Sequence, residues 1–459
     1  MKELTPSELW RGELRATLLL AAPLAAANLL QMLVYALDVI FVARLGTQTL
    51  AASSLGVTIF GLLMWSTTGL VGAVAPLISA ELGRKRHAVR EVRRTMRMGL
   101  WLTVIASLWV TAVCLAGPAI MHATGQDPEL TRLAGQFLNI LMWAALPNIA
   151  TFLFRSFVSA LGRPGFATLV TFLAVLVNGV GNYAFVFGHL GAPAMGLQGS
   201  AVASVLTACA TLGAYLWIVF TDRRLRRYRI FGRWWRSDWA RFADVLRIGL
   251  PIMAIIIAEG GLFSSAAFLM GLIGEAQLAG HTVALQVAAL AFQIPFGIGQ
   301  AVTIRVGYHF GARDNAAIAR AGRAALTLAL GYMALPAALM ILAPRLVLRL
   351  YVDPAAPENA AMVGFAVQFL AIAAAFQLFD GAQAVLAGAL RGLQDTRVPM
   401  VLALTGYWLF GFSASAALGL FTPLAGMGVW LGLAIGLVVV SILLMHRWQA
   451  RARLGLLPV

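Results

Sequence analysis

The sequence is poor in charged residues and in cysteine. Charged residues make up 11% of the chain and cysteine only two positions, whereas 61% of the residues are hydrophobic. Soluble globular domains carry about 25% charged residues, so this composition excludes a soluble fold. Cys114 and Cys209 both lie inside apolar runs and provide neither a disulfide framework nor a clustered metal site. Apolar runs of bilayer-spanning length recur along the chain, so we expect a multi-pass, all-α membrane protein without a cleavable signal peptide.

Histidine is also scarce. The six His residues fall in loops or at the ends of apolar segments, and none combines with a carboxylate or thiol in a pattern typical of a metal site or a nucleophile. The sequence therefore predicts neither an enzyme nor a cofactor. The net charge of +16 does not indicate a nucleic-acid partner, because the basic residues flank the apolar segments and so report membrane topology.

Twelve apolar segments have the length of membrane-spanning helices. We place them at residues 16–43, 51–78, 96–117, 132–152, 165–188, 196–220, 245–273, 281–304, 320–343, 361–390, 398–420 and 426–446. If the termini and the even-numbered loops share one side, the other side keeps four of the 34 Lys and Arg residues, namely Arg44, Arg132, Arg345 and Arg349. The positive-inside rule then predicts cytoplasmic termini in the plasma (inner) membrane.

The chain repeats itself with a nearly constant register. Pro23, Gly46 and Gly83 recur 228 positions later as Pro251, Gly274 and Gly311, and Met195 and Gly196 recur 232 positions later as Met427 and Gly428. The repeat predicts two homologous six-helix bundles that enter the membrane in the same direction. We expect an N-terminal lobe at 1–222, a C-terminal lobe at 247–459, and between them a basic cytoplasmic linker at 223–246, partly an amphipathic helix on anionic lipid.

Three carboxylates lie within the predicted spans, namely Asp38, Glu259 and Asp380. A charge inside a membrane is costly unless it is protonated, ion-bound, paired or hydrated, so each carboxylate is a candidate functional residue. Two alternatives stay open: polar groups also join helices by hydrogen bonds, and Asp38 is close enough to its helix end to reach water. Glu259 and Asp380 fall in matching helices of the second half, and we predict that they share one site for H+ or Na+.

Neighbouring polar residues extend these two candidate sites. Asn178 and Asn182 are spaced i, i+4 and share a helix face from which they can donate to Asp38. The repeat aligns Gln31 with Glu259. The residues that can help a carboxylate pair hold a cation are Gln377, Gln383 and Ser264. Candidates for an adaptable substrate wall are the Met and aromatic residues Met32, Tyr35, Phe263 and Phe292.

Four stretches together resemble the multidrug and toxic compound extrusion (MATE) transporters, in their NorM-type branch. They are Pro23 with Asp38, GNYAFVFG at 181–188 preceded by Asn178, AEGGLFSSAAFLMG at 258–271, and FDGAQAVLAGALRGLQDTRVPM at 379–400. The resemblance covers essentially the whole chain. It implies a V-shaped pair of six-helix bundles, expected as a monomer, that exports cationic and amphipathic drugs in exchange for Na+ or H+.

The resemblance also assigns roles to individual residues. Glu259 and Asp380 correspond to a cation site in the C-terminal lobe, and Asp38 with Asn178 to a site in the N-terminal lobe coupled to bending at Pro23. The chain departs from the family pattern at Phe376, where a tyrosine is expected one turn before Asp380. The missing hydroxyl removes a ligand for Na+, and H+ is therefore at least as favoured as the coupling ion.

Two other transporter classes fit part of the pattern. A major-facilitator-type transporter also has twelve helices in two parallel halves, and the basic loop after the second helix weakly matches its loop motif, although the Asp-Arg and Gly-Arg order is missing. A flippase of lipid-linked precursors belongs to the same superfamily as the MATE transporters. Such a flippase favours an arginine-rich cavity, whereas no arginine lies at the centre of a predicted span.

Overall fold

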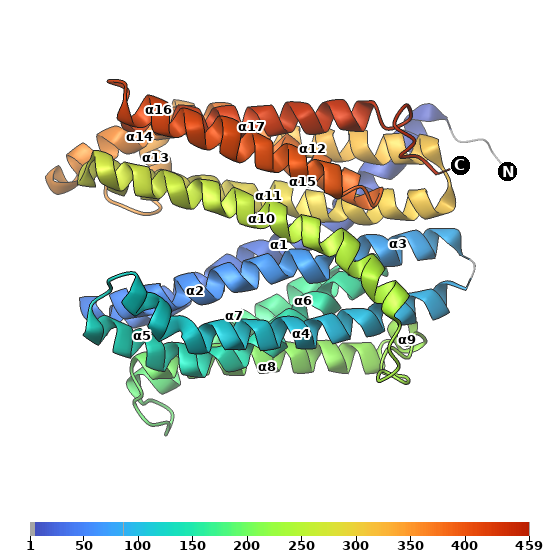
Figure 1. Cartoon of the computed structure of the whole chain (residues 1–459), viewed down its shortest axis with the longest axis horizontal. Coiled ribbons are helices and arrows are strands. Elements are labelled where there is room, and N and C mark those ends of the chain that lie inside the picture. The colour runs from blue at the N-terminus through green and yellow to red at the C-terminus, as the bar shows by residue number, and fades with distance from the viewer. Residues whose placement is uncertain (1–4, 86, 459) are drawn as a thin grey trace. The chain divides into compact units, whose positions relative to one another are not determined.

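The computed structural model of the chain describes residues 5–85 and 87–458, and these residues form helices and loops without a strand (Figure 1). Twelve helical segments of this described part are long and apolar enough to span a membrane, as the sequence predicted. The spans are Pro6–Ala43, Thr47–Arg84, Ala88–Ala123, Pro128–Ala160, Gly165–Phe187, Leu197–Thr221, Trp239–Ile273, Glu275–Ala312, Asn315–Leu342, Pro357–Gly392, Arg397–Leu420 and Gly426–Gln449.

Several spans consist of more than one helical element. The elements are α1 (Pro6–Ala43), α2 (Thr47–Gly72), α3 (Val74–Arg84), α4 (Ala88–Ala123), α5 (Pro128–Leu141), η1 (Met142–Ala144), α6 (Ala145–Ala160), α7 (Gly165–Phe187), α8 (Leu197–Thr221), α9 (Arg223–Arg226), α10 (Trp239–Ile273), α11 (Glu275–Ala312), α12 (Asn315–Leu342), α13 (Pro344–Leu348), η2 (Pro357–Asn359), α14 (Ala360–Gly392), α15 (Arg397–Leu404), η3 (Thr405–Phe412), α16 (Ser413–Leu420) and α17 (Gly426–Gln449). Many helices are longer than predicted, because Glu, Arg and Lys continue a helix readily beyond its apolar part.

The chain divides into two compact units, each described by itself. One unit comprises residues 26–253, and the other comprises α1 up to Ala25 together with residues 254–459. Two helices therefore change unit part-way, α1 after Ala25 and α10 after Met253. The two points of change are 228 positions apart, which is the spacing of the sequence repeat. This exchange of helix segments was not part of the predicted division into lobes at 1–222 and 247–459.

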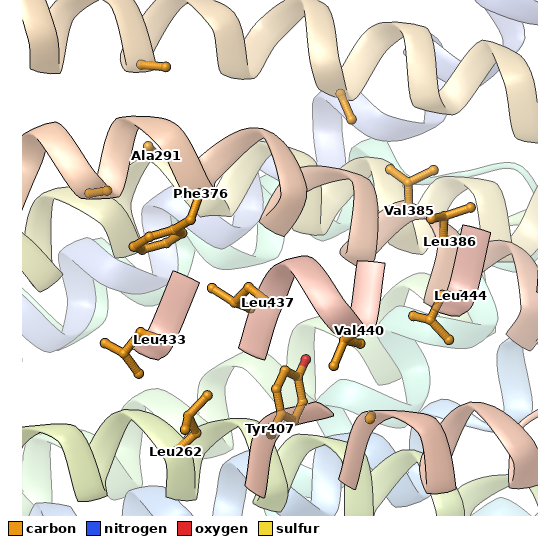
Figure 2. Close-up of a cluster of buried hydrophobic side chains, with 14 of the residues drawn as sticks. Leu262, Ala291, Phe376, Val385, Leu386, Tyr407, Leu433, Leu437, Val440 and Leu444 are labelled. Carbon is orange, nitrogen blue, oxygen red and sulfur yellow. The ribbon is translucent and has the colours of Figure 1, made fainter. Parts of the chain in front are cut away.

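The second unit has its core around α11, α14 and α17. The Trp430 ring stacks on Phe369 and Phe376, with ring centroids 5.8 Å and 5.7 Å away. Figure 2 shows part of this core, in which α17 presents Leu437 and Val440 beside Tyr407. Glycines let the helices approach closely, because a Cβ at Gly406 would overlap the Val440 side chain. Small residues at helix contacts are typical of membrane proteins, where dispersion forces between closely packed helices provide much of the stability.

The linker at 223–246 is helical at both ends and non-helical in between. α9 forms its first turn and α10 begins at Trp239, so the predicted, partly amphipathic helix is interrupted by turns and extended residues at 227–238. Side chains of α4 bind the linker carbonyls: Arg93 Nε donates to Tyr228 O at 2.7 Å and Trp101 Nε1 donates to Trp234 O at 3.0 Å. These hydrogen bonds replace the i to i−4 bonds of a helix, so the linker is fixed to α4 instead of coiling.

Candidate functional site

The first candidate site lies in the unit of residues 26–253, where Asp38 of α1 meets two amides of α7. Asn178 Nδ2 donates to Asp38 Oδ1 at 2.9 Å, and Asn182 Nδ2 donates to the same oxygen at 2.8 Å. Both asparagine side chains are fully buried. Asp38 thus turns toward α7, and the i, i+4 spacing brings both amides to one carboxylate oxygen as the sequence predicted.

A third polar group at this site was not predicted. Ser204 Oγ of α8 donates to Asp38 Oδ2 at 3.4 Å, so both carboxylate oxygens have partners. The close approach of α7 and α8 makes this possible, because a Cβ at Gly181 would lie 3.0 Å from Ala203 Cβ. The sequence signal was weak, because Ser204 is one of two serines in the first third of an apolar helix. Asn182 Oδ1 is buried and has no partner within the described residues, which leaves one acceptor beside the carboxylate.

The second candidate site lies in the other unit, where α10 and α14 bring Glu259 and Asp380 together. Asp380 is 7% exposed and Glu259 is half-buried. The two carboxylates interact electrostatically, and Gln383 lies within hydrogen-bonding reach of Glu259. The sequence placed Glu259, Asp380 and Gln383 in one site; in the structure all three interact, and their shared role as a cation site stays a prediction.

Tyr407 completes this second site and was missed by the sequence reasoning. Gln383 Nε2 donates to its hydroxyl, and the ring is fully buried (Figure 2). Tyr407 belongs to η3, a π-helical turn, and such turns occur often at functional sites. Neither the π-helical turn nor the direction of the Tyr407 side chain could be read from the run TGYWLFGF. Tyr407 therefore supplies a hydroxyl from a different helix than the one where Phe376 replaces the expected tyrosine.

Several buried polar atoms of the second site have no hydrogen-bond partner within the part of the chain that the structure describes. They are Asp380 Oδ1, Gln383 Oε1, and both Oε1 and Nε2 of Gln377. Buried polar atoms are nearly always satisfied, so an unpartnered cluster marks a place where water or a ligand binds. The oxygens are carboxylate and amide oxygens, which are the ligands that Na+ and other hard cations prefer. The residues therefore fit a bound cation.

Of the other predicted site residues, Tyr35 lies one turn before Asp38 on α1 and interacts with it electrostatically, and Gln31 is within hydrogen-bonding reach of Tyr35. Ser264 is exposed, and it lies five positions after Glu259 on α10, about 140° around the helix. Phe263 packs against the hydrophobic core, and Phe292 stacks on Phe296 with centroids 6.0 Å apart. On α1, the remaining candidates are the half-buried Gln31 and Met32 and the 58% exposed Tyr35. Phe376 is buried against Trp430.

The α1 helix continues without interruption through Pro23, and a polar contact follows soon after it. Arg155 Nη2 of α6 donates to Asn28 Oδ1 at 2.6 Å, and the Asn28 side chain is buried. This arginine was not predicted as a site residue. It fixes α1 to α6 just after the point where α1 enters the unit of residues 26–253.

The chain is similar to known proteins over nearly its whole length. The family model MatE matches residues 23–184 and 251–417. The protein named "Probable multidrug resistance protein NorM" of Mesorhizobium japonicum is 45% identical over 98% of this chain and 96% of its own length. "Multidrug resistance protein NorM" of Burkholderia vietnamiensis is 36% identical, with 94% and 93% covered.

Solved structures share the fold at low sequence identity. The eukaryotic MATE transporter AtDTX14 matches with a TM-score of 0.85 and 19% identity, over 97% of this chain and 99% of its own. A MATE protein in the straight conformation matches with a TM-score of 0.86 and 20% identity, over 99% of both chains. The two segments matched by the family model begin at Pro23 and Pro251, the same pair that marks the internal repeat.

Proposed function

The chain belongs to the MatE family, and we propose that it is a multidrug efflux antiporter that exports cationic and amphipathic compounds in exchange for H+ or Na+. The family and the twelve spans make it a membrane transporter, which excludes an enzyme and the alternative of a major-facilitator-type transporter. The relatives named NorM support multidrug export as its task.

The observation that carries the proposal is the paired carboxylates Glu259 and Asp380 beside unpartnered amide oxygens. Two carboxylates close together in a poorly solvated site repel each other, so the binding of a positive charge relieves the repulsion. A proton, Na+ or an organic cation can each do so. Their occupancies are then mutually exclusive, which is the coupling that an antiporter needs.

Asp38 provides the second coupling point. Its carboxylate oxygens accept hydrogen bonds from Asn178, Asn182 and Ser204. Protonation of Asp38 would turn one of these oxygens into a hydroxyl, which donates a hydrogen bond. The hydrogen bonds to α7 and α8 would then rearrange. Because Asp38 follows Pro23 on one continuous helix, we infer that a change at Asp38 is passed to α1 as bending near the proline.

The energetics favour exchange of one cation for another. Moving one charge across 100 mV is worth about 2.3 kcal/mol. Export of a monovalent drug against one entering cation is electrically neutral, so it draws only on the concentration gradients. The hydroxyl of Tyr407 adds a possible oxygen ligand, whereas Phe376 removes one, so the ligand set suits either ion and H+ is at least as favoured as Na+.

Proteoliposomes test both the function and the ion. A cationic dye is loaded into vesicles that hold the purified protein, the membrane potential is clamped with an ionophore, and an H+ or a Na+ gradient is imposed separately. We expect gradient-driven dye movement with H+. Robust movement with Na+ at equal pH on both sides, absent with H+, would overturn proton coupling, and no movement with either would overturn the proposed antiport.

We also propose that the protein is a monomer in the plasma membrane. The distribution of Lys and Arg supports a topology with both termini in the cytoplasm. The alternative of a lipid-linked precursor flippase would favour several arginines around a cavity. Arg155 is bound to Asn28, so it does not add to such a cavity. The names of the relatives favour drug efflux.

A further inference from the structure

Each helix that changes unit carries a buried charge near its N-terminal end. On α1 this residue is Glu13, whose side chain is 6% exposed, and on α10 it is Arg241, whose side chain is 11% exposed. The two residues are 228 positions apart, so they occupy the same place in the repeat. They have opposite charges.

Glu13 binds two cationic or potentially cationic residues of α11. Arg305 Nε lies 2.8 Å from Glu13 Oε1 and Arg305 Nη2 lies 2.6 Å from Oε2, which is a bidentate pair. His309 Nε2 lies 3.5 Å from Glu13 Oε2 and 3.1 Å from Arg305 Nη2. We call these three residues the first clasp. Bidentate Arg–carboxylate pairs combine strength with a fixed geometry, so the clasp holds the start of α1 on α11.

Arg241 binds two acidic residues of its own unit, the one formed by residues 26–253. Its Nη2 lies 2.6 Å from Glu91 Oε2 on α4 and 3.3 Å from Glu81 Oε1 on α3. We call these three residues the second clasp. Glu81 is 228 positions before His309, so the two residues occupy the same position in the repeat. Glu81 belongs to the second clasp and His309 to the first. The two clasps therefore share two repeat positions, 13 with 241 and 81 with 309, and the charge is exchanged between Glu13 and Arg241, whereas Arg305 and Glu91 stand at positions that do not correspond.

A second contact holds each helix near the point where it changes unit. On α1, Ala25 lies against Gly297 of α11, where an added Cβ would be 2.8 Å from the Ala25 backbone nitrogen. On α10, a Cβ added at Gly249 would overlap the carbonyl oxygen of Leu70 on α2. Each helix segment is thus fixed at two levels, by a clasp near its start and by a glycine contact near its end.

We propose that Glu13 and Arg241 are positioning residues for transport, which keep residues 6–25 of α1 and 239–253 of α10 fixed within their units while the following part of each helix bends. With one end fixed, a rearrangement at Asp38 or Glu259 is converted into bending after Pro23 or Pro251. Without the clasp, the whole segment shifts and the bend is lost. The proposal rests on the proposed transport function, because transport rate is one of its readouts.

The first test uses the full-length protein with Glu13→Gln and, as matched control, Glu8→Gln. Glu8 is exposed on the same helix, and its hydrogen-bond partner among the described residues is Thr5. We expect Glu13→Gln to lower the maximal rate of dye efflux about tenfold with little change in KM, and to raise hydrogen–deuterium exchange in residues 6–25 but not in 26–43. Glu8→Gln should match the wild type in both measurements. A wild-type rate or unchanged exchange for Glu13→Gln overturns the proposal.

The second test converts the first clasp into the charges of the second. The triple variant Glu13→Arg, Arg305→Glu, His309→Glu should regain at least about half of the wild-type rate, whereas Glu13→Arg alone should retain less than about a tenth. A triple variant that is no better than the single one overturns the equivalence of the clasps, provided it is as abundant and monodisperse as the wild type.

If the triple variant does not fold, variants of the second clasp test the proposal instead. Arg241→Gln should raise exchange in residues 239–253 and slow efflux, and Arg241→Lys should partly restore both; equal behaviour of the two variants overturns the proposal. Exchange needs no transport, so it separates failure of the clasp from failure of the antiport. If the wild-type protein moves no dye, the proposed function is overturned. Hydrogen–deuterium exchange then still shows whether the clasp fixes its helix segment.

Discussion

Asp38 Oδ1 accepts hydrogen bonds from two amides one turn apart on the same helix, Asn178 Nδ2 at 2.9 Å and Asn182 Nδ2 at 2.8 Å. The shared oxygen links α1 to α7 within the unit of residues 26–253. The Asp38 carboxylate is therefore bonded to side chains of α7 and is not directed toward water at the end of α1. The arrangement makes Asp38 a better candidate for ion coupling than for a residue that reaches the membrane surface.

We expect Asp38→Asn to abolish most drug efflux while the protein remains folded. The amide keeps an oxygen that can accept from Asn178, but it removes the charge that a proton or cation would neutralise. Dye efflux from cells should fall about tenfold or more, at unchanged abundance in the membrane. The control Asp353→Asn changes an exposed loop carboxylate and should be silent. Wild-type efflux by Asp38→Asn would remove this residue from the coupling site.

A tyrosine introduced at position 376 should increase the response to Na+. Phe376 lies one turn before Asp380, so Phe376→Tyr would add a hydroxyl oxygen near the unpartnered carboxylate oxygen. The matched control is Phe369→Tyr, because Phe369 stacks on the same Trp430 ring but lies about two turns before Phe376 on α14, farther from Asp380. Efflux in proteoliposomes with an imposed Na+ gradient should rise for the first variant only. Equal responses of both variants would contradict this ligand assignment.

Asp238 should stabilise the protein in a pH-dependent way. The hydrogen bond from Arg94 Nε, 2.6 Å from Asp238 Oδ2, lowers the pKa of this carboxyl below its ordinary value of about 3.9. A lowered folded-state pKa contributes stability above the unfolded-state value, and the contribution is lost as pH falls through the folded-state value. In detergent, Asp238→Asn should lower Tm by about 1–2 °C near neutral pH.

The difference in Tm should shrink as pH falls below about 4, where the unfolded-state carboxyl becomes protonated, and it should vanish only below the lower folded-state pKa, where the carboxyl is protonated in both states. Asp353→Asn, which removes a carboxylate without an arginine partner among the described residues, serves again as the control. A difference between wild type and Asp238→Asn that grows toward acid pH would have the wrong sign for this ion pair.

Loss of the Arg93 side chain should expose the linker to trypsin. Arg93 Nε binds the Tyr228 carbonyl, and the linker that follows α9 has exposed arginines at positions 229, 233 and 236. A hydrogen bond from a charged donor is worth about 1.5–3 kcal/mol, so Arg93→Ala should speed cleavage between the halves about tenfold. Arg90→Ala, which changes an exposed arginine of the same helix, is the control. Gel analysis of the two fragments measures the rate, and equal rates would show that Arg93 does not hold the linker.

The spans and the Asp38 site could be predicted because each depends on local sequence. The length of an apolar run sets a span, and the i, i+4 spacing of Asn178 and Asn182 sets a common face. The approach of Glu259 and Asp380 followed from the repeat and from their depth in the membrane. The functional roles of all these residues stay predictions.

Tyr407 and the exchange of helix segments could not be predicted for a physical reason. Both the lipid-facing and the core-facing sides of a membrane helix are apolar, so periodicity does not show which residue faces the site. For the same reason, the sequence does not show with which unit the start of α1 packs. The interruption of the linker helix at 227–238 could not be predicted because the sequence pattern suits a helix, whereas the bonds from Arg93 and Trp101 to the linker carbonyls come from a distant segment.

The opposite charges of Glu13 and Arg241 make the two halves unable to replace each other. In two associated copies of the first half, Glu13 of one copy would meet Glu81 and Glu91 of the other. In two copies of the second half, Arg241 would meet Arg305 and His309. Like charges would face each other in both homodimers, and only the pairing of one half with the other gives attraction. The sequence repeat therefore joins two halves whose first helices carry complementary, and not identical, charges.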